Sequence, residues 1–205
     1  LALSISDYKT LEDNFEKYSR YKNTPLNQIK FDLLSTIDEI AWLKYNSNLA
    51  VYLHLNNEEN IPKALFTNTE SKYNFRGINI RDQRLPEDFL SFLKSFGAPF
   101  KPSKVAKVDD FLIYASNKAF LKQLIGAKLD GNTLHKDFNF KSLLEDLADN
   151  SSYLWVGNTS NLKKRWKKNS SKKLVWDNIK LNKYPLIVTQ GISENNFVQS
   201  RFTVQ

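Results

Sequence analysis

The sequence predicts an α+β protein built on antiparallel sheet, and three observations lead to this fold class. Short runs in which apolar and polar residues alternate are joined by turn-forming residues, which is typical of β-hairpins. Three segments combine a short apolar strand with a helix that carries large apolar residues four positions apart. No linker rich in Pro, Gly or Ser divides the 205 residues, so we expect a single continuous domain over residues 1–205.

The three strand–turn–helix modules begin at residues 1, 111 and 153. Each apolar run is followed by two residues able to accept hydrogen bonds from a starting helix: Ser6 and Asp7, Ser116 and Asn117, and Asn158 and Thr159. Each helix then carries two apolar anchors on one face: Leu11 and Phe15, Leu121 and Ile125, and Leu162 and Trp166. The repetition raises the hypothesis of an internal duplication, with residues 1–82 echoed by 152–205 and bridged by 83–151.

Antiparallel hairpins are expected between the modules. Three pairs of alternating runs indicate them: "EIAWLKY" with "LAVYLHL" around residues 46–48, "SKVAKV" with "FLIYAS" around residues 109–110, and "PLIVTQGI" with "FVQSRFTV" around residues 193–196. The runs "KALFTNT" and "YNFRGINI" are expected to continue the first meander.

Further helices are expected at 26–37, 86–96 and 140–148. The second begins with Pro86, which suits a first helical turn, and stops at Gly97, a usual C-cap residue. The third places four apolar residues on one stripe, namely Phe140, Leu143, Leu144 and Leu147.

The positive charge is concentrated in one stretch. The chain carries a net charge of +8, and the run "NLKKRWKKNSSKK" at 161–173 holds seven cations and no acid, so the rest carries 8 − 7 = +1. Its cations are the candidate contact for an anionic partner: Lys163, Lys164, Arg165, Lys167, Lys168, Lys172 and Lys173. Trp166 occupies the slot of a core anchor, so we favour a solvated helix face over contact with nucleic acid, an acidic protein, anionic lipid or glycan.

Catalytic and metal-binding signatures are missing from the sequence. It has no Cys, no Gly-rich phosphate loop and no nucleophile-elbow motif, so we expect no enzymatic activity, no cofactor and no metal. His54 lies in an alternating strand and shares a face with Tyr52, which favours a structural or surface role. His135 lies in a polar connection near Asp130 and Asp137, where a general base is conceivable, but no nucleophile motif accompanies it. The acidic pairs in "VDDF" and "NNEEN" are interpreted as turn residues.

A family resemblance rests on three segments: "DDFLIYASNKAFLKQLI", "SSYLWVGNTSNLKKRW" and "YPLIVTQGISENNFVQSRF". Together they resemble an uncharacterised class of bacterial envelope proteins, in which an exported, often lipid-anchored α+β region precedes a β-propeller. The resemblance implies an extracytoplasmic, non-enzymatic module of a larger assembly, in the periplasm or at the outer-membrane surface, with a lipid anchor supplied ahead of Leu1. It assigns no site residues.

The leading hypothesis is therefore a non-enzymatic cell-envelope subunit that makes protein–protein contacts. The alternative is a carrier of lipid or another apolar ligand, because curved sheet with many aromatic residues can enclose an apolar cavity. The second alternative is binding of nucleic acid or an anionic surface through the basic helix 161–173.

Overall fold

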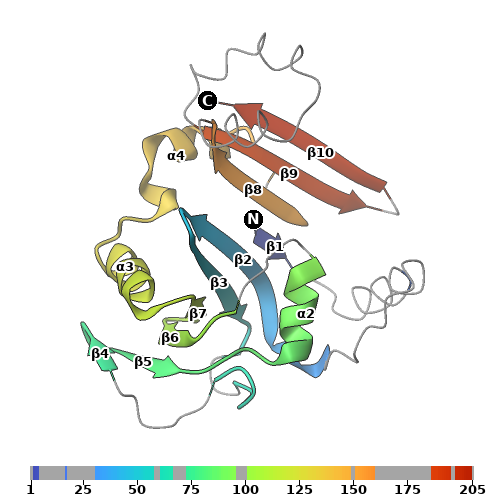
Figure 1. The fold of residues 1–205 in the computed structure, drawn as a ribbon. Helices are drawn as coiled ribbons and strands as arrows, with labels where there is room; N and C mark the ends of the chain where they lie inside the picture. The colour runs from blue at the N-terminus through green and yellow to red at the C-terminus, as the bar shows by residue number, and fades with distance from the viewer. Residues whose placement is uncertain are drawn as a thin grey trace. The chain divides into compact units, whose positions relative to one another are not determined.

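The computed structural model describes residues 2–4, 17, 31–57, 61–66, 73–95, 101–148, 151–159, 186–194 and 197–204. The chain forms two compact units, Ala2–Asp130 and Gly131–Gln205, the second together with Leu1. Each unit combines helix with antiparallel strands (Figure 1), which confirms the predicted α+β class. The expectation of one continuous domain stays a prediction, and each unit is described separately below.

An antiparallel sheet forms the centre of the unit Ala2–Asp130. Its described strands are β1 (Ala2–Ser4), β2 (Ile37–Tyr45), β3 (Asn48–Leu55), β4 (Tyr73–Phe75), β5 (Ile78–Asp82), β6 (Lys104–Val108) and β7 (Phe111–Ala115). They lie in the order β1-β2-β3-β7-β6-β5-β4. The pairing of β3 with β7, in which Tyr52 lies opposite Ile113 and His54 opposite Phe111, joins two hairpins that are far apart in sequence.

Two predicted hairpins of this unit, β2–β3 and β6–β7, are confirmed. Each turns through a residue in the left-handed conformation, Asn46 with φ 53° and Asp109 with φ 52°. Asn and Asp adopt this conformation more readily than other side-chain-bearing residues, because their short polar side chains bond locally to the backbone.

The expected continuation of the first meander by "KALFTNT" and "YNFRGINI" needs correction. Residues 63–65 form a turn in which the N–H of Leu65 donates to the carbonyl of Pro62 at 2.8 Å, and residues 67–69 lie outside the described part. The second run forms strand as expected, as β4 and β5 around a tight turn at Arg76 (φ 54°) and Gly77 (φ 85°), but β5 pairs with β6 and β3 pairs with β7. Two consecutive residues with positive φ are typical of a type I′ hairpin turn, and Gly77 was the signal for it.

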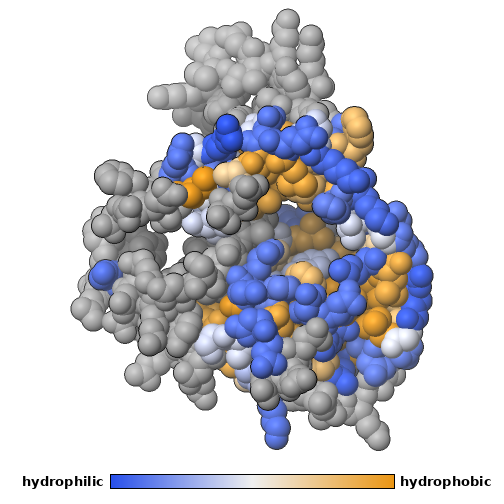
Figure 2. Space-filling model, turned by 180° about the vertical axis from the view of Figure 1, so that it is seen from behind, coloured by the Kyte–Doolittle hydropathy of each residue, from blue (hydrophilic) through white to orange (hydrophobic). Residues whose placement is uncertain are grey.

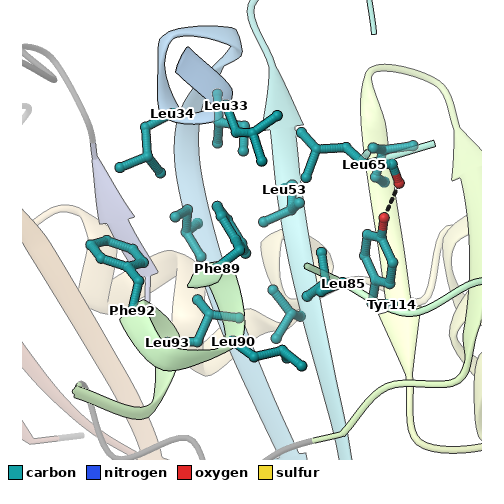
Figure 3. Close-up of a cluster of buried hydrophobic side chains, with 14 of the residues drawn as sticks. Leu33, Leu34, Leu53, Leu65, Leu85, Phe89, Leu90, Phe92, Leu93 and Tyr114 are labelled. Atoms are coloured by element: carbon teal, nitrogen blue, oxygen red, sulfur yellow. Dashed lines mark hydrogen bonds between the residues drawn. The ribbon is translucent and has the colours of Figure 1, made fainter. Parts of the chain in front are cut away.

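Helix α2 (Glu87–Ser95) covers one face of this sheet and lies within the predicted helix 86–96; Gly97 lies outside the described residues. Phe89, Leu90, Phe92 and Leu93 point from α2 toward the strands, where they meet Leu53 and Tyr114 (Figure 3). The spacing of these four residues places them on one helical face. Tyr114 is fully buried, and its hydroxyl donates a hydrogen bond to the carbonyl of Leu65, which fastens the turn 63–65 over this core.

Helix α3 (Lys118–Leu129) packs against the opposite face of the sheet, so this unit has three layers. The predicted cap is confirmed, since the Asn117 side chain accepts a hydrogen bond from the N–H of Phe120 at 2.8 Å. The predicted anchors Leu121 and Ile125 are both fully buried. The second strand–turn–helix module therefore forms as the sequence predicts.

The described part of the segment 26–37 differs from the single helix expected there. Residues Phe31–Thr36 form a short 3-10 helix, η1, and the chain enters β2 at Ile37; residues 26–30 lie outside the described part. Isoleucine is β-branched and favours strand, and Ile37 is buried opposite Leu55.

The unit Gly131–Gln205 contains β8 (Tyr153–Asn158), β9 (Leu186–Glu194) and β10 (Phe197–Val204), in which β9 pairs antiparallel with both neighbours. This confirms the predicted C-terminal hairpin. After the short 3-10 helix η2 (Leu134–Lys136), helix α4 (Phe138–Leu144) starts two residues before the predicted 140–148 and ends four earlier. Asp137 caps it, because its carboxylate accepts from the N–H of Phe140 at 2.9 Å.

The apolar stripe of α4 packs on β8 and β9, as predicted for Phe140, Leu143, Leu144 and Leu147. Gln190 is buried beside them. Its amide oxygen accepts a hydrogen bond from the N–H of Ala148 at 2.9 Å, and its amide nitrogen donates one to the carbonyl of Ala148 at 2.7 Å. The helices predicted after Ser6–Asp7 and after Asn158–Thr159 lie outside the described residues, apart from Lys17 and Thr159.

Candidate functional site

His54 is the centre of a cluster of ionisable side chains on the α3 face of the sheet. It lies near the end of β3, and the alternation of the strand places it on the same face as Tyr52, as predicted. Its Nδ1 contacts the Asp38 carboxylate, and its Nε2 lies 2.8 Å from Oδ2 of Asp110. Three separate elements therefore converge on one imidazole ring.

A β-bulge brings Asp38 and Glu39 to this ring. The pairing of β2 with β3 shifts register between Ile37 and Glu39, so the chain contains one extra residue there. Ile37 and Ile40 both enter the core under α2 although they are three positions apart. The two residues between them consequently face the other side of the sheet, where Glu39 pairs with His54 across the strands.

The β6–β7 turn supplies the acids on the other side of the ring. The left-handed conformation of Asp109 reverses the chain, and the next residue, Asp110, directs its carboxylate at His54. The turn is also fastened to β3, since the N–H of Leu55 donates to the Asp110 carbonyl at 2.9 Å. Asp109 itself pairs with Lys128 of α3 at 3.3 Å.

These contacts shift three pKa values. Partial burial pulls the pKa of His54 down, but hydrogen bonds to Asp38 and Asp110 and their negative charges together outweigh it and raise this pKa above its ordinary value. Burial pushes the pKa of Asp110 up, but the hydrogen bond to His54, a backbone hydrogen bond and the charges of His54 and Lys128 lower it overall. Although Glu39 is exposed as a residue, desolvation of its carboxyl raises its pKa, with an opposing effect of His54 and a further rise from Asp38.

The geometry favours a charged latch over a proton-transfer group. An imidazolium can donate one hydrogen bond from each ring nitrogen, which matches a carboxylate on either side. A general base needs an unprotonated nitrogen within reach of its substrate, and here both nitrogens face carboxylates. The cluster ties the start of β2, the end of β3 and the β6–β7 turn together.

An apolar pocket adjoins the cluster. It has a volume of about 120 Å³ and is lined by five residues: Tyr52, Val108, Phe111, Ile113 and Lys128. The Phe111 ring lies 4.7 Å from the His54 ring, so the pocket and the charged cluster share a wall. Burial raises the pKa of Tyr52 to about 12, so this phenol is neutral at physiological pH. The Lys128 ammonium lies 5.4 Å from the centre of the Phe111 ring.

The sequence also singled out the basic run 161–173 and His135. The seven cations of 161–173 lie outside the described residues, so their role stays a prediction. His135 is exposed on η2, and the acids considered as its partners have other roles, because Asp130 pairs with Arg76 at 2.7 Å and Asp137 caps α4. Within the described ranges, no three His, Asp or Glu side chains are arranged to hold a metal ion.

The sequence indicated His54 and the sheet face that it shares with Tyr52, but it did not indicate the carboxylates that contact the ring. "VDDF" was interpreted only as a turn, and Asp38 was not considered. The missing information is the pairing of β3 with β7 and the bulge in β2, which bring three distant segments together. One signal was available: Asp38 and Glu39 separate two isoleucines three apart, a spacing that strict strand alternation does not give.

Comparisons with known proteins give no relatives: no family model, no curated protein and no solved structure matches this chain. Among the described helices, none has the length and apolar character needed to cross a membrane.

Proposed function

We propose that this chain is a non-enzymatic binding subunit that makes protein–protein contacts. The observation that carries the proposal is the engagement of both ring nitrogens of His54 by carboxylates. This cluster is the best candidate for proton transfer among the described side chains, and its geometry serves to hold three backbone segments in register. A rigid, latched surface beside an apolar pocket suits recognition, since preorganised sites lose little entropy on binding.

The apolar pocket supports a binding function more strongly than the exposed apolar surface does. On the side opposite to that of Figure 1, hydrophobic residues reach the surface at several places among hydrophilic ones (Figure 2). Such exposure is usual in folded proteins and needs no partner. A pocket with apolar walls and a charged margin is different, because anchor side chains in such pockets dominate the energy of many interfaces.

A second candidate function, favoured by the same pocket, is the carriage of an apolar ligand. Its volume of about 120 Å³ limits such a ligand to roughly one ring or a short branched chain. A lipid tail needs more room, since ligand pockets for larger molecules span about 300–1,000 Å³. Extraction of the purified protein with organic solvent, followed by mass spectrometry, checks this candidate: a stoichiometric small molecule supports carriage, and an empty extract contradicts it.

We further propose an extracytoplasmic location in the cell envelope, with a protein assembly as the setting. The support is the resemblance of residues 109–125, 151–166 and 184–202 to envelope proteins. Fractionation of cells that express the full-length gene product tests it: recovery in the cytoplasm contradicts this location. Binding of nucleic acid or an anionic surface through 161–173 is the remaining alternative, and the absence of affinity for DNA, RNA and anionic vesicles at low salt would exclude it.

The finer architecture is also a proposal, namely repeated strand–turn–helix modules and a duplication of 1–82 in 152–205. The support is the module at Phe111–Leu129, whose cap and anchors form as predicted. If the third module is equivalent, Trp166→Ala should cost roughly 3–5 kcal/mol of unfolding free energy. Replacing Lys163, Lys164, Lys167 and Lys168 by Gln should leave that free energy unchanged. Equal tolerance of both changes would refute the module.

Photo-crosslinking in cells of the organism that encodes the protein tests the binding function. A photoreactive amino acid replaces one of three exposed residues of the full-length protein: Glu39 opposite His54, Tyr45 at the tip of β2, or Lys94 on α2. The proposal predicts discrete protein adducts from Glu39, since it borders the site. An absence of protein adducts at all three positions contradicts a protein-binding function.

A further inference from the structure

We infer that the pocket beside His54 receives a phenyl side chain, flanked by basic residues, from a protein partner. This inference rests on the proposed binding function and specifies the chemistry of the partner. It depends on three observations: the apolar lining and volume of the pocket, the excess of acid at its margin, and the latch that holds this margin in place.

The lining of the pocket selects an apolar group of about the size of one ring. Val108, Phe111 and Ile113 form hydrocarbon walls, and Tyr52 adds a second aromatic ring. A cavity of about 150 Å³ lined by apolar residues is known to accept benzene, and the present pocket of about 120 Å³ is only slightly smaller. An indole is larger than this space, and an alanine methyl leaves most of it empty. Aromatic rings also contact each other favourably in tilted arrangements, which Phe111 and Tyr52 can offer.

The margin of the pocket is acidic. Four carboxylates, those of Asp38, Glu39, Asp109 and Asp110, face two cations, His54 and Lys128, which leaves a net charge of −2. The chain as a whole carries +8, so this margin reverses the prevailing sign. A partner with cations beside its anchor therefore meets complementary charge, which speeds encounter and fixes orientation.

This charge argues against the other classes of partner at this pocket. Nucleic acid and anionic lipid present phosphates, which four carboxylates repel. A hydrophobic protein segment without charge would fill the pocket but leave the net negative charge of its margin uncompensated. The acids remain in place because the latch fixes Asp38 and Asp110, and the salt bridge to Lys128 fixes Asp109.

Three short peptides serve as probes in a titration of the purified chain, followed by the NMR signals of the Val108 and Ile113 methyl groups. The first is acetyl-Lys-Phe-Lys-amide, for which we expect methyl shifts that saturate with a Kd on the order of 1 mM. Acetyl-Lys-Ala-Lys-amide should leave the methyl signals unchanged, because it has no ring. Acetyl-Glu-Phe-Glu-amide should bind about fivefold more weakly or worse, because its charges are repelled.

Two matched variants test the role of the acidic margin. The double variant Glu39→Gln/Asp109→Asn removes two charges while preserving the latch, and Asn is well suited to the left-handed conformation at 109. We expect its affinity for the Lys-Phe-Lys peptide to fall by about twofold to fivefold. In the control Glu87→Gln/Glu145→Gln, the same charge is removed from α2 and from the C-cap of α4, and the affinity should not change.

Several outcomes would overturn the inference. They are an absence of methyl shifts with the Lys-Phe-Lys peptide, equal shifts with the Glu-Phe-Glu peptide, or an equal loss of affinity in both double variants. Methyl shifts that follow protein concentration alone would assign the pocket to a second copy of the chain and contradict the inference as well. If crosslinking from Glu39 still yields protein adducts while the peptides fail, the binding function stands and only the partner chemistry falls.

Discussion

His54 shows how a single residue can stabilise three separate segments. Its side chain is 29% exposed, so its ion pairs are partly screened by water and contribute about 1 kcal/mol or less together. The contribution depends on protonation, because a neutral ring can donate to only one of the two carboxylates.

The pH dependence of this contribution follows from the directions of the pKa shifts. The folded pKa of His54 is raised above 6.5, so its stabilisation is complete below the unfolded pKa and is lost as pH rises through the folded value. The folded pKa of Asp110 is lowered from 3.8, so its contribution is lost as pH falls through that lowered value. The latch should therefore stabilise the fold most between about pH 4 and 6.5.

The variant His54→Gln tests this dependence. Urea unfolding should show a loss of stability of about 1 kcal/mol or less at pH 5.5, and a smaller loss at pH 8.5. His135→Gln, at an exposed histidine of η2, serves as control and should show no such change between the two pH values. A loss from His54→Gln that grows toward pH 8.5 would contradict the latch.

The hydroxyl of Tyr114 offers a second test at the residue scale. It is buried and donates to the carbonyl of Leu65, so Tyr114→Phe leaves a buried acceptor without its partner. The unfolding free energy should fall by about 1–2 kcal/mol. Tyr45→Phe, at a residue 60% exposed, is the matched control and should change it by less than about 0.5 kcal/mol. Equal effects would show that the bond to Leu65 is unimportant.

At the scale of elements, the sequence was sufficient to predict the turns and helix caps that depend on a few neighbouring residues. The hairpins at 46–47 and 109–110 turn at Asn46 and Asp109, which take the left-handed conformation, and α3 starts where the Asn117 side chain accepts from the Phe120 N–H. The turn at 63–65 was missed, because Leu65 and Phe66 pack on the core as strand residues would. The hydrogen bonds that hold the turn, from the Leu65 N–H to Pro62 and from the Tyr114 hydroxyl to Leu65, have no signal in the sequence. The end of α4 was predicted too late, because Leu147 continues its apolar stripe although residues 145 and 146 form a turn.

The cap of α3 gives a prediction at this scale. Asn117→Ala removes the acceptor for the Phe120 N–H and should lower the unfolding free energy by about 1 kcal/mol. Asn117→Asp keeps an acceptor at the same position and should retain most of the stability. Thermal unfolding of both variants checks this, and an equal loss in both would mean that the cap is not the cause.

At the scale of the whole molecule, the two units differ in the size of their described cores. The unit Ala2–Asp130 buries apolar residues on both faces of its sheet, under α2 and under α3. In the unit Gly131–Gln205, the described cluster consists of Phe140, Leu143 and Val188 with partly buried neighbours. The sequence predicted the class of both, because alternation and helical periodicity are local. The sequence did not predict the candidate site, because Asp110 reaches Asp38 and His54 only through a long-range strand pairing.

The central claim is that His54 is a closed, charged latch and that the surface beside it binds. The most direct measurement is the nitrogen NMR spectrum of the His54 ring as a function of pH. The account predicts that the ring is mostly protonated, on both nitrogens, at pH 6.5 and that the midpoint of its titration lies above pH 6.5. A ring that is mostly neutral at pH 6.5 would contradict it, because one nitrogen would then carry a free lone pair and the site could act as a base.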